Sequence, residues 1–310
     1  MPERHGYGVK FSINNPNLLI VATSQQFGRK GSGTLFLLKQ LPDNEIICLQ
    51  SYDWDDALFD ADWCNGELIC TASGDGSIQL WNSNDTSSTT PEMCYKEHSE
   101  EVYSVDCTKN DVGRIISSSW DCTVKLWDIL YSKSLSTYSE HSQLVYQSKF
   151  SANHRDVFAS VSGDGCLKLW NTNCSTAMIT VQTNSPEVLT CDWNPTNPNV
   201  VATGGSEGLL KLWDIRNFSM PLLQVFSGCT AIRKIRYSPH NSDLLASVSY
   251  DGMTRIWNLN QPLDPAESIQ NHSDSAFGLD WNPFRNNQLV DCGWDSFVQV
   301  FSSKVAGISN

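Results

Sequence analysis

A tryptophan that returns at nearly constant spacing is the feature that most constrains how this chain can fold. Five six-residue segments begin with glycine or cysteine and close on Trp81, Trp127, Trp170, Trp213 and Trp257. These tryptophans follow one another at intervals of 46, 43, 43 and 44 residues. Two degenerate copies, Gly33–Leu38 and Ser296–Phe301, extend the series by 43 and 44 residues, so the chain contains seven units. A fixed period of about 20 to 50 residues indicates a fold that stacks one supersecondary unit.

Each unit carries the pattern of four short β-strands. In the third unit, apolar alternation between turn residues predicts strands at Glu101–Asp106, Arg114–Ser118, Thr123–Trp127 and Ser134–Tyr138. Four strands at this period, ending in Trp-Asp or Trp-Asn, are typical of a WD-repeat blade. We therefore predict an all-β, seven-bladed WD-repeat β-propeller in which residues 1–310 form a single domain.

Polar residues that can join the strands of one blade by hydrogen bonds recur at fixed offsets. Two blades carry the complete set, which is His98, Ser117, Asp121 and Trp127 in the third and His141, Ser160, Asp164 and Trp170 in the fourth. Such a network makes a small blade rigid when every member has a partner. The other blades keep parts of it: Thr71, Asp75 and Trp81; Thr203, Glu207 and Trp213; Ser247, Asp251 and Trp257; His272 and Asp295. Asn184 and Gly228 stand at histidine positions and predict weaker joining in the fifth and sixth blades.

Closure of the ring is the next question for such a fold. A propeller closes when strand material from one end of the chain completes its last blade. Only residues 1–6 precede the expected first strand, Tyr7–Ser12. We therefore expect the segment Lys304–Ile308 to supply the outer strand of the seventh blade.

The charge of the chain restricts its partners. Lysine and arginine number 21 against 34 aspartates and glutamates, and the net charge of −13 repels phosphate backbones and anionic lipids. The sequence lacks an apolar run that could span a membrane, and the polar stretch Met1–His5 predicts no secretory signal. The eleven cysteines form no Cys-x-x-Cys pair and are expected to be reduced thiols of a cytosolic protein. We expect neither nucleic-acid binding nor membrane insertion.

Few residues carry the pattern of a catalytic or cofactor site. Three of the six histidines belong to the blade networks, and the spacing of the remaining histidines, cysteines and aspartates resembles no metal site. The segment Gly28–Gly33 lacks the spacing of a phosphate loop and is expected to be a turn of the first blade. The acidic cluster Asp53–Asp56 has no partner base and is expected to form an exposed acidic rim. We predict no enzyme activity, no cofactor and no metal.

One surface remains as a candidate for binding: the face where the histidine loop and the aspartate turn of each blade open around the axis, here called the top face. Five residues beyond the histidine position, the seven blades carry Tyr7, Phe59, Tyr103, Tyr146, Leu189, Arg233 and Phe277. Positions just before the turn aspartate include Trp120, Tyr250 and Trp294. Positions three beyond the histidine include Glu101, Leu144 and Glu187.

Two interpretations of these aromatic residues stay open. The rings can simply pack the ends of the inner strands, since strands favour aromatic residues. Alternatively, they form a groove for an amphipathic helix whose apolar face meets the rings and whose cations meet Glu101, Glu187 and Asp55. The candidate peptide-binding residues are Phe59, Glu101, Tyr103, Trp120, Leu144, Tyr146, Glu187, Leu189, Tyr250, Phe277 and Trp294.

Four segments resemble the peroxisomal targeting signal type 2 receptors, the peroxin seven family: Arg4–Tyr7, Tyr52–Asp60, Tyr95–Asp106 and Ala231–Ile235. The Asp-Trp-Asp-Asp cluster and the Glu-Glu-Val-Tyr-Ser-Val run in these segments lie outside the general WD-repeat pattern. The resemblance implies a soluble receptor that shuttles between the cytosol and the peroxisome and binds a short amino-terminal helix on matrix enzymes. It also implies the peroxisomal docking machinery and a co-receptor, either a long form of the type 1 signal receptor or a dedicated fungal co-receptor.

The position of Arg233 and the choice of function class stay open. Gly228-Cys229 departs from the usual Gly-His pair, so Arg233 is placed less securely; if it faces the groove, it would repel cargo cations or pair with Glu187. Seven-bladed propellers also serve as scaffolds, such as substrate adaptors of ubiquitin ligases or subunits of chromatin or signalling complexes, and the fold alone does not choose among them. An enzyme is the third option.

Overall fold

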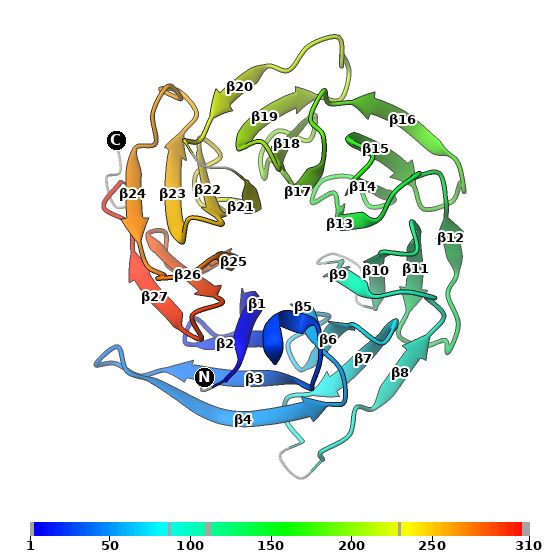
Figure 1. The fold of residues 1–310 in the computed structure, drawn as a ribbon, viewed down its shortest axis with the longest axis vertical. Coiled ribbons are helices and arrows are strands. Elements are labelled where there is room, and N and C mark those ends of the chain that lie inside the picture. The colour runs from blue at the N-terminus through cyan, green and yellow to red at the C-terminus, as the bar shows by residue number, and fades with distance from the viewer. Residues whose placement is uncertain (1–2, 86–87, 109–112, 229–230, 306–310) are drawn as a thin grey trace.

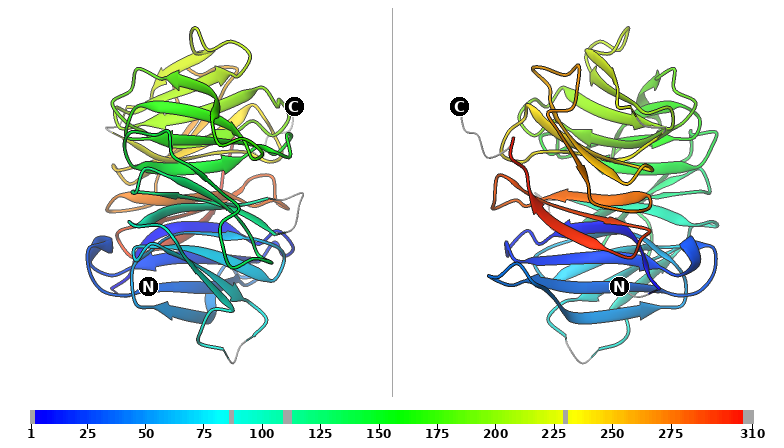
Figure 2. Two further views of the ribbon diagram at one scale, coloured as in Figure 1. Left: turned by 90° about the vertical axis from the view of Figure 1, so that its right-hand side faces the viewer. Right: turned by 60° about the vertical axis from the view of Figure 1, so that its left-hand side comes forward.

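The chain folds into a ring of antiparallel sheets. The computed structural model describes residues 3–85, 88–108, 113–228 and 231–305. Within these residues, 27 strands form seven sheets that stand around a common axis (Figure 1). Figure 2 shows the ring from the side, with the first and last blades next to each other. The predicted all-β, seven-bladed WD-repeat β-propeller is confirmed. Among the helices of the described part, none is long and apolar enough to cross a membrane.

The strands of each blade follow one another outward from the axis in chain order. The first two blades contain β1 (His5–Phe11), β2 (Leu18–Ser24), β3 (Gly33–Gln40) and β4 (Ile46–Trp54), then β5 (Leu58–Trp63), β6 (Leu68–Ser73), β7 (Ser77–Asn82) and β8 (Met93–Lys96). The third and fourth contain β9 (Val102–Cys107), β10 (Arg114–Ser119), β11 (Val124–Asp128) and β12 (Ser136–Tyr138), then β13 (Val145–Phe150), β14 (Val157–Ser162), β15 (Cys166–Asn171) and β16 (Ala177–Gln182).

The remaining blades continue the same pattern. The fifth and sixth contain β17 (Val188–Trp193), β18 (Val200–Gly205), β19 (Leu209–Asp214) and β20 (Leu223–Phe226), then β21 (Ile232–Tyr237), β22 (Leu244–Ser249), β23 (Met253–Asn258) and β24 (Glu267–Gln270). The seventh contains β25 (Ala276–Trp281), β26 (Gln288–Gly293) and β27 (Val298–Ser302). A short 3₁₀ helix, η1 (Gln26–Gly28), lies between β2 and β3.

The hydrophobic core lies between successive blades. Every residue of the inner strands β5, β9, β17 and β21 is buried, because neighbouring blades cover both faces of each strand. The outer strands β8 and β20 instead combine buried and exposed positions. The closing tryptophans fill the space between blades: Trp127 is fully buried and its ring lies 5.4 Å from the ring of Tyr95 in the preceding blade.

The two complete polar networks form as predicted. In the third blade the Trp127 indole Nε1 donates a hydrogen bond to Ser117 Oγ over 2.8 Å. The His98 ring joins Ser117 Oγ, 2.8 Å from its Nε2, to Asp121 Oδ2, 2.8 Å from its Nδ1. The fourth blade repeats these three bonds at 2.8, 2.7 and 2.8 Å. Burial alone would raise the pKa of the Asp121 and Asp164 carboxyls, but the hydrogen bonds and charges of their histidine partners hold both pKa values well below the usual range.

Blades with an incomplete set replace the histidine by another polar side chain. In the second blade Trp81 Nε1 donates to Thr71 Oγ1 over 2.9 Å, and Thr71 donates to Gln79 Oε1 over 2.6 Å. In the sixth blade, the Arg255 guanidinium donates to Asp251 Oδ2 over 2.6 Å. The turn aspartate of the sixth blade is therefore held by Arg255, whereas Asp75 of the second blade accepts the backbone N–H of Ser77 over 3.0 Å.

The seventh blade uses a carboxylate where the complete sets use serine. His272 Nδ1 lies 2.9 Å from Asp295 Oδ1, as the sequence pattern predicts. On its other side, His272 Nε2 lies 3.1 Å from Asp291 Oδ1. Burial lowers the pKa of His272, but the hydrogen bonds and charges of these two aspartates outweigh it and raise that pKa overall. Phe301 replaces the closing tryptophan, so no indole N–H needs a hydroxyl partner in this blade.

The expected outer strand of the seventh blade, Lys304–Ile308, falls mostly outside the described residues. The seventh blade has three strands in the described residues, and Lys304 and Val305 lie outside any strand; residues 306–308 of the predicted outer strand lie outside the described residues. The expected first strand, Tyr7–Ser12, is confirmed as β1 of the complete first blade, with bounds His5–Phe11. Side chains join the two blades: Phe11 N donates to Asp280 Oδ2 over 3.0 Å, and Asn282 Nδ2 donates to the Pro16 carbonyl over 2.8 Å.

A ring of charged residues links the blades at the end of the axis opposite to the top face. One residue per blade contributes to it: Lys10, Asp62, Asp106, Lys149, Asp192, Arg236 and Asp280. The aspartates accept backbone N–H groups of the next blade, for example Asp62 from Cys107 N at 3.0 Å and Asp106 from Phe150 N at 2.9 Å. Arg236 lies 3.8 Å from Asp192, and Lys149 pairs with Asp106. The sequence analysis did not predict that these charged residues link neighbouring blades.

Candidate functional site

The predicted top-face aromatics meet in one cluster around the axis. The cluster consists of the buried residues Tyr7, Ala57, Phe59, Tyr103 and Phe277, with the partly buried Tyr146 and Trp294 packed against them. Phe59, Tyr103 and Phe277 each stand second in the inner strand of a different blade. The shared sequence offset therefore becomes a shared position in space.

A β-bulge at the same place in every blade explains this convergence. In the second blade Leu58 pairs with Ser73 and Asp60 pairs with Ala72, so Phe59 is skipped by the strand ladder. The skipped residues of the seven blades are Tyr7, Phe59, Tyr103, Tyr146, Leu189, Arg233 and Phe277. A bulge bends its strand and re-aims the side chain of the extra residue. Bulges at barrel rims and next to binding sites commonly serve this purpose.

The rings touch one another from the seventh blade round to the fourth. Phe277 lies 5.0 Å from Tyr7, and Tyr7 lies 5.2 Å from Phe59. Phe59 lies 5.2 Å from Tyr103, which lies 5.9 Å from Tyr146. These centroid distances are those of favourable edge-to-face and tilted aromatic pairs. The result is a continuous aromatic floor, defined here as Tyr7, Phe59, Tyr103, Tyr146 and Phe277.

Arg233 completes the floor on the side where the aromatic residues end. Its guanidinium lies 4.6 Å from the ring centroid of Tyr103, in the third blade, and 5.1 Å from that of Phe277, in the seventh. It therefore contacts aromatic side chains of two blades that are not neighbours. The side chain is buried, which alone would lower its pKa, but Tyr103, Tyr250 and Asp60 raise that pKa overall. A cation over aromatic faces is stabilised by the ring quadrupoles.

Two further predicted aromatics stand above the floor and reach solvent. Trp120 is 38% exposed with its ring 5.5 Å from Tyr103, and Tyr250 is 42% exposed with its ring 5.5 Å from Phe277. Trp294 stacks on Phe277 at 4.5 Å with an interplanar angle of 15°. Large exposed rings beside a buried aromatic floor form an apolar surface of the kind that marks interaction sites.

Acidic and aliphatic candidates border this surface. Glu187 accepts a hydrogen bond from Tyr146 Oη over 3.1 Å, whereas the guanidinium of Arg233 lies on the rings. Burial and then the Glu187 charge raise the pKa of Tyr146, which keeps its hydroxyl a donor.

The other predicted border residues differ in exposure. Glu101 is half-buried, and its carbonyl accepts the backbone N–H of Trp120 over 3.0 Å. Leu144 is half-buried and Leu189 is buried. Outside the cluster, Asp53 and Asp55 are exposed, as expected of an acidic rim.

Phe27 belongs to this surface and was missed by the sequence prediction. It lies in η1, and its ring stacks on His5 with the centroids 3.9 Å apart. The centroid of the Phe27 ring lies 5.0 Å from that of Trp294, with the two rings edge to face. The residue adopts a φ of 56°, in the left-handed region that few non-glycine residues occupy. Phe27 stands in a loop beside the predicted Gly28–Gly33 turn, at a position that does not recur from blade to blade. The repeat pattern therefore could not predict its place in the surface.

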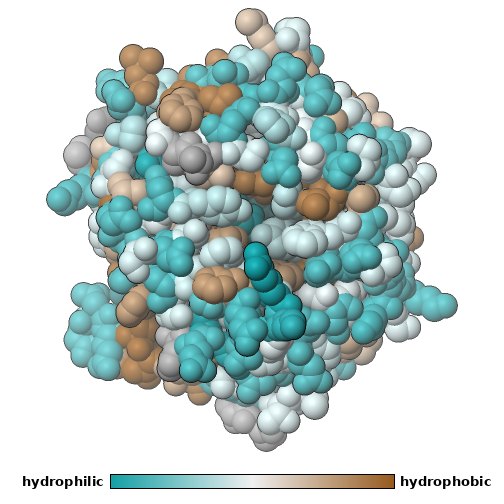
Figure 3. All heavy atoms as spheres, in the orientation of Figure 1, coloured by the Kyte–Doolittle hydropathy of each residue, from teal (hydrophilic) through white to brown (hydrophobic). Residues whose placement is uncertain are grey.

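The face that carries η1 is turned toward the viewer in Figures 1 and 3, as the side view in Figure 2 shows. Figure 3 shows hydrophobic groups bordering a hollow at the centre of the ring, with hydrophilic groups around them. A floor of rings, a few exposed aromatics and scattered carboxylates can bind an amphipathic peptide by apolar contact and charge. This arrangement makes one end of the propeller axis the candidate binding surface.

Comparison with known proteins agrees with this description. The WD domain, G-beta repeat family matches residues 89–128, 132–171, 176–214 and 220–258. The chain is therefore a WD-repeat propeller with a candidate peptide-binding top face.

Full-length similarity then identifies the family within this class. The peroxisomal targeting signal 2 receptor of Mus musculus is 43% identical over 304 residues, which cover 97% of this chain and 95% of the mouse protein. The Homo sapiens receptor of the same name is 46% identical over 140 residues, 44% of this chain and 42% of the human protein. That of Saccharomyces cerevisiae is 38% identical over 136 residues, 43% of this chain and 35% of the yeast protein. The chain belongs to the family of peroxisomal targeting signal 2 receptors.

Proposed function

We propose that this protein is an import receptor that binds the amino-terminal, amphipathic helical type 2 targeting signal of peroxisomal matrix proteins at its top face. It then delivers them, with a co-receptor, from the cytosol to the peroxisomal docking machinery. The observation that carries the proposal is the bulge shared by all seven blades, which gathers five aromatic rings into one floor. A structural role for aromatics would not require the exposed Trp120 and Tyr250 above that floor.

The floor suits one face of a short helix. Apolar residues at helical spacing can contact Trp120, Tyr250 and the partly buried Tyr146. Lysine or arginine side chains on the flanks can reach Glu101 and Glu187. The net charge of −13 attracts a basic signal over longer range. Arg233 opposes this attraction only weakly, because its charge is buried against the rings.

The open surface gives a physical reason for the need of a co-receptor. A helix lying on an open surface leaves its other face exposed to water, and ordering a disordered signal costs part of the binding energy. A second protein that covers the exposed face adds the missing apolar contact. We propose that this protein is the long form of the type 1 signal receptor or a dedicated fungal-type co-receptor.

Titration of a fluorescent type 2 signal peptide tests the proposal. The purified protein is titrated with and without the co-receptor fragment, and Glu101→Lys and Trp120→Ala are compared with wild type. Glu45→Lys and Phe284→Ala are matched controls, because both residues are exposed in turns at the opposite end of the strands. We expect the two top-face variants to weaken saturable binding at least tenfold while the controls bind as wild type.

Circular dichroism confirms that each variant retains the wild-type fold. Absence of peptide binding by folded wild type in both conditions, with a co-receptor fragment that is active with a mouse receptor control, would overturn the proposal. The scaffold interpretation would then take its place.

A further inference from the structure

One position breaks the pattern of the inner strands at the end opposite to the top face. The residue after the ring of charges is aromatic in six blades and cysteine in the third; in chain order these residues are Phe11, Trp63, Cys107, Phe150, Trp193, Tyr237 and Trp281. Cysteine is far smaller than an aromatic residue, so the neighbourhood of Cys107 must be filled in another way. Two side chains of the second blade, Cys64 and Cys70, occupy that space.

The three sulfur atoms lie close together inside the protein. Cys107 Sγ is 3.0 Å from Cys64 Sγ and 3.3 Å from Cys70 Sγ, and all three atoms lie within 4.8 Å of one another. Each residue is less than 5% exposed. They come from three places in the chain: the residue after β5, the middle of β6 and the end of β9. The rigid sheets of two adjacent blades therefore hold the three thiols in place.

The group supplies three sulfur ligands. Thiolates, rather than thiols, coordinate metals. Among the described residues, no fourth histidine, cysteine or carboxylate ligand joins this group. Three soft sulfur ligands without a fourth favour a soft monovalent ion over zinc(II), whose sites are tetrahedral.

We propose that Cys64, Cys70 and Cys107 form a binding site for one copper(I) ion. An ion at the centre of a sulfur triangle, with metal–sulfur bonds of about 2.3 Å, requires sulfur atoms about 4 Å apart. The separations from Cys107 Sγ, 3.0 Å to Cys64 Sγ and 3.3 Å to Cys70 Sγ, are shorter than this, so rotation of the side chains must open the triangle by up to about 1 Å when the ion enters. Binding replaces the S–H···S hydrogen bonds by metal–sulfur bonds, and each thiol that coordinates releases its proton to solvent. No electron is transferred, because the ion is supplied as copper(I).

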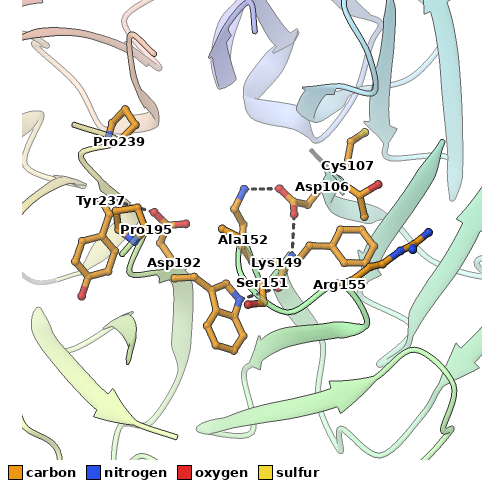
Figure 4. A pocket seen from close by; sticks show the side chains of 13 residues that line it. Asp106, Cys107, Lys149, Ser151, Ala152, Arg155, Asp192, Pro195, Tyr237 and Pro239 are labelled. Carbon is orange, nitrogen blue, oxygen red and sulfur yellow. Dashed lines mark hydrogen bonds and ion pairs between the residues drawn. The ribbon is translucent and has the colours of Figure 1, made fainter. Parts of the chain in front are cut away.

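A cavity at this end of the axis gives a route to the site. Cys107 lines a cavity of about 120 Å³ together with Asp106 and Lys149, and Figure 4 shows these three side chains at its edge. The site lies away from the peptide surface, since Cys107 follows Tyr103 by four residues on β9, or about 13 Å along a strand. Copper binding and peptide binding are therefore separate properties that can be tested independently.

Anaerobic titration with copper(I) tests this inference. The reduced, full-length protein competes for copper(I) with the chromophoric chelator bicinchoninate, and stoichiometry is read from the loss of chelator colour. We expect one tightly bound ion per chain, a copper–thiolate absorption band in the ultraviolet and a higher thermal midpoint of the loaded protein. Cys70→Ala and Cys64→Ala should each weaken binding at least tenfold.

Cys191→Ala is the matched control, because Cys191 is fully buried in an inner strand but lies outside the group. Its copper(I) affinity should equal that of wild type. Equal affinities of Cys70→Ala, Cys64→Ala and wild type would overturn the site, and so would absence of binding to the folded wild type. Tight binding of zinc(II) with no binding of copper(I) would also overturn it. Should one variant fail to fold, the other gives the answer, since either substitution removes a ligand.

Discussion

Two arginines on one strand show how different the two ends of the propeller axis are. Arg233 and Arg236 both lie buried on β21 (Ile232–Tyr237), three residues apart. At the top face, Arg233 lies over the rings of Tyr103 and Phe277. At the opposite end, Arg236 lies 3.8 Å from Asp192 and 3.9 Å from Asp280, in the ring of charges.

The difference separates stability from binding. At the charged end, carboxylates accept backbone N–H groups of neighbouring blades, so their hydrogen-bonding capacity is used within the molecule. At the top face, the aromatic floor is packed, but Trp120 and Tyr250 stay partly exposed above it. One end of the axis therefore joins neighbouring blades, and the other end leaves apolar area exposed, which we propose a partner covers.

The largest expected effect comes from replacing each arginine by methionine. Arg236→Met removes the guanidinium from beside Asp192 and Asp280, of which Asp280 keeps Lys10 at 3.9 Å, and removing one partner of a buried ion pair costs about 3 to 5 kcal/mol. Arg233→Met removes two cation–π contacts but keeps apolar contact with the rings, so we expect a loss of about 1 kcal/mol. Urea unfolding of both variants measures the difference. Equal losses would show that the two ends are energetically alike.

A smaller loss is expected from the turn aspartates at the top rim. Asp121→Ala removes the acceptor of His98 and Thr123 and should destabilise the fold by about 1 to 3 kcal/mol. Because the folded-state pKa of Asp121 lies below its unfolded value of about 3.9, this stability is present above that pH and lost as the pH falls below it. In thermal unfolding from pH 7 to pH 3, the difference in stability between wild type and Asp121→Ala should become smaller. A constant difference would contradict the role of the Asp121 carboxylate.

The smallest expected effect separates binding from folding directly. Tyr250→Ala truncates an exposed ring, so the free energy of unfolding should change by less than about 1 kcal/mol. Binding of a type 2 signal peptide in the presence of co-receptor should weaken by at least about 1 kcal/mol, roughly fivefold, because exposed aromatics at an interface often carry its energy. Fluorescence anisotropy and urea unfolding on the same sample measure both. A variant that loses stability but keeps affinity would place Tyr250 in the fold rather than in the site.

The blade architecture could be predicted from the sequence because the residues that specify each blade repeat along the chain. The offsets from His98 to Ser117, Asp121 and Trp127 recur in the fourth blade, and both networks form at hydrogen-bonding distance. Two contacts that depart from this set were not predicted. Thr71 donates to Gln79 in the second blade, and Asp291 contacts His272 at the serine offset of the seventh.

The candidate site was accessible to a similar extent. Counting five residues from the histidine position found Phe59, Tyr103 and Phe277, which do meet in the aromatic floor. The count did not reveal that a bulge directs them there, because a bulge depends on pairing with the neighbouring strand. Phe27 was not predicted as part of the site because its loop does not recur in the other blades. The role of these residues in peptide binding stays a prediction.

By itself, the sequence determined what repeats within about 45 residues: the strands, the turns, the closing tryptophans and therefore the propeller. Tertiary structure alone decided the contacts between residues far apart in the chain. Phe11 meets Asp280 where the ring closes, and Cys107 meets Cys64 and Cys70 across two blades. The physical reason is that local periodicity specifies each sheet, whereas the space between sheets is filled by whichever side chains packing brings together.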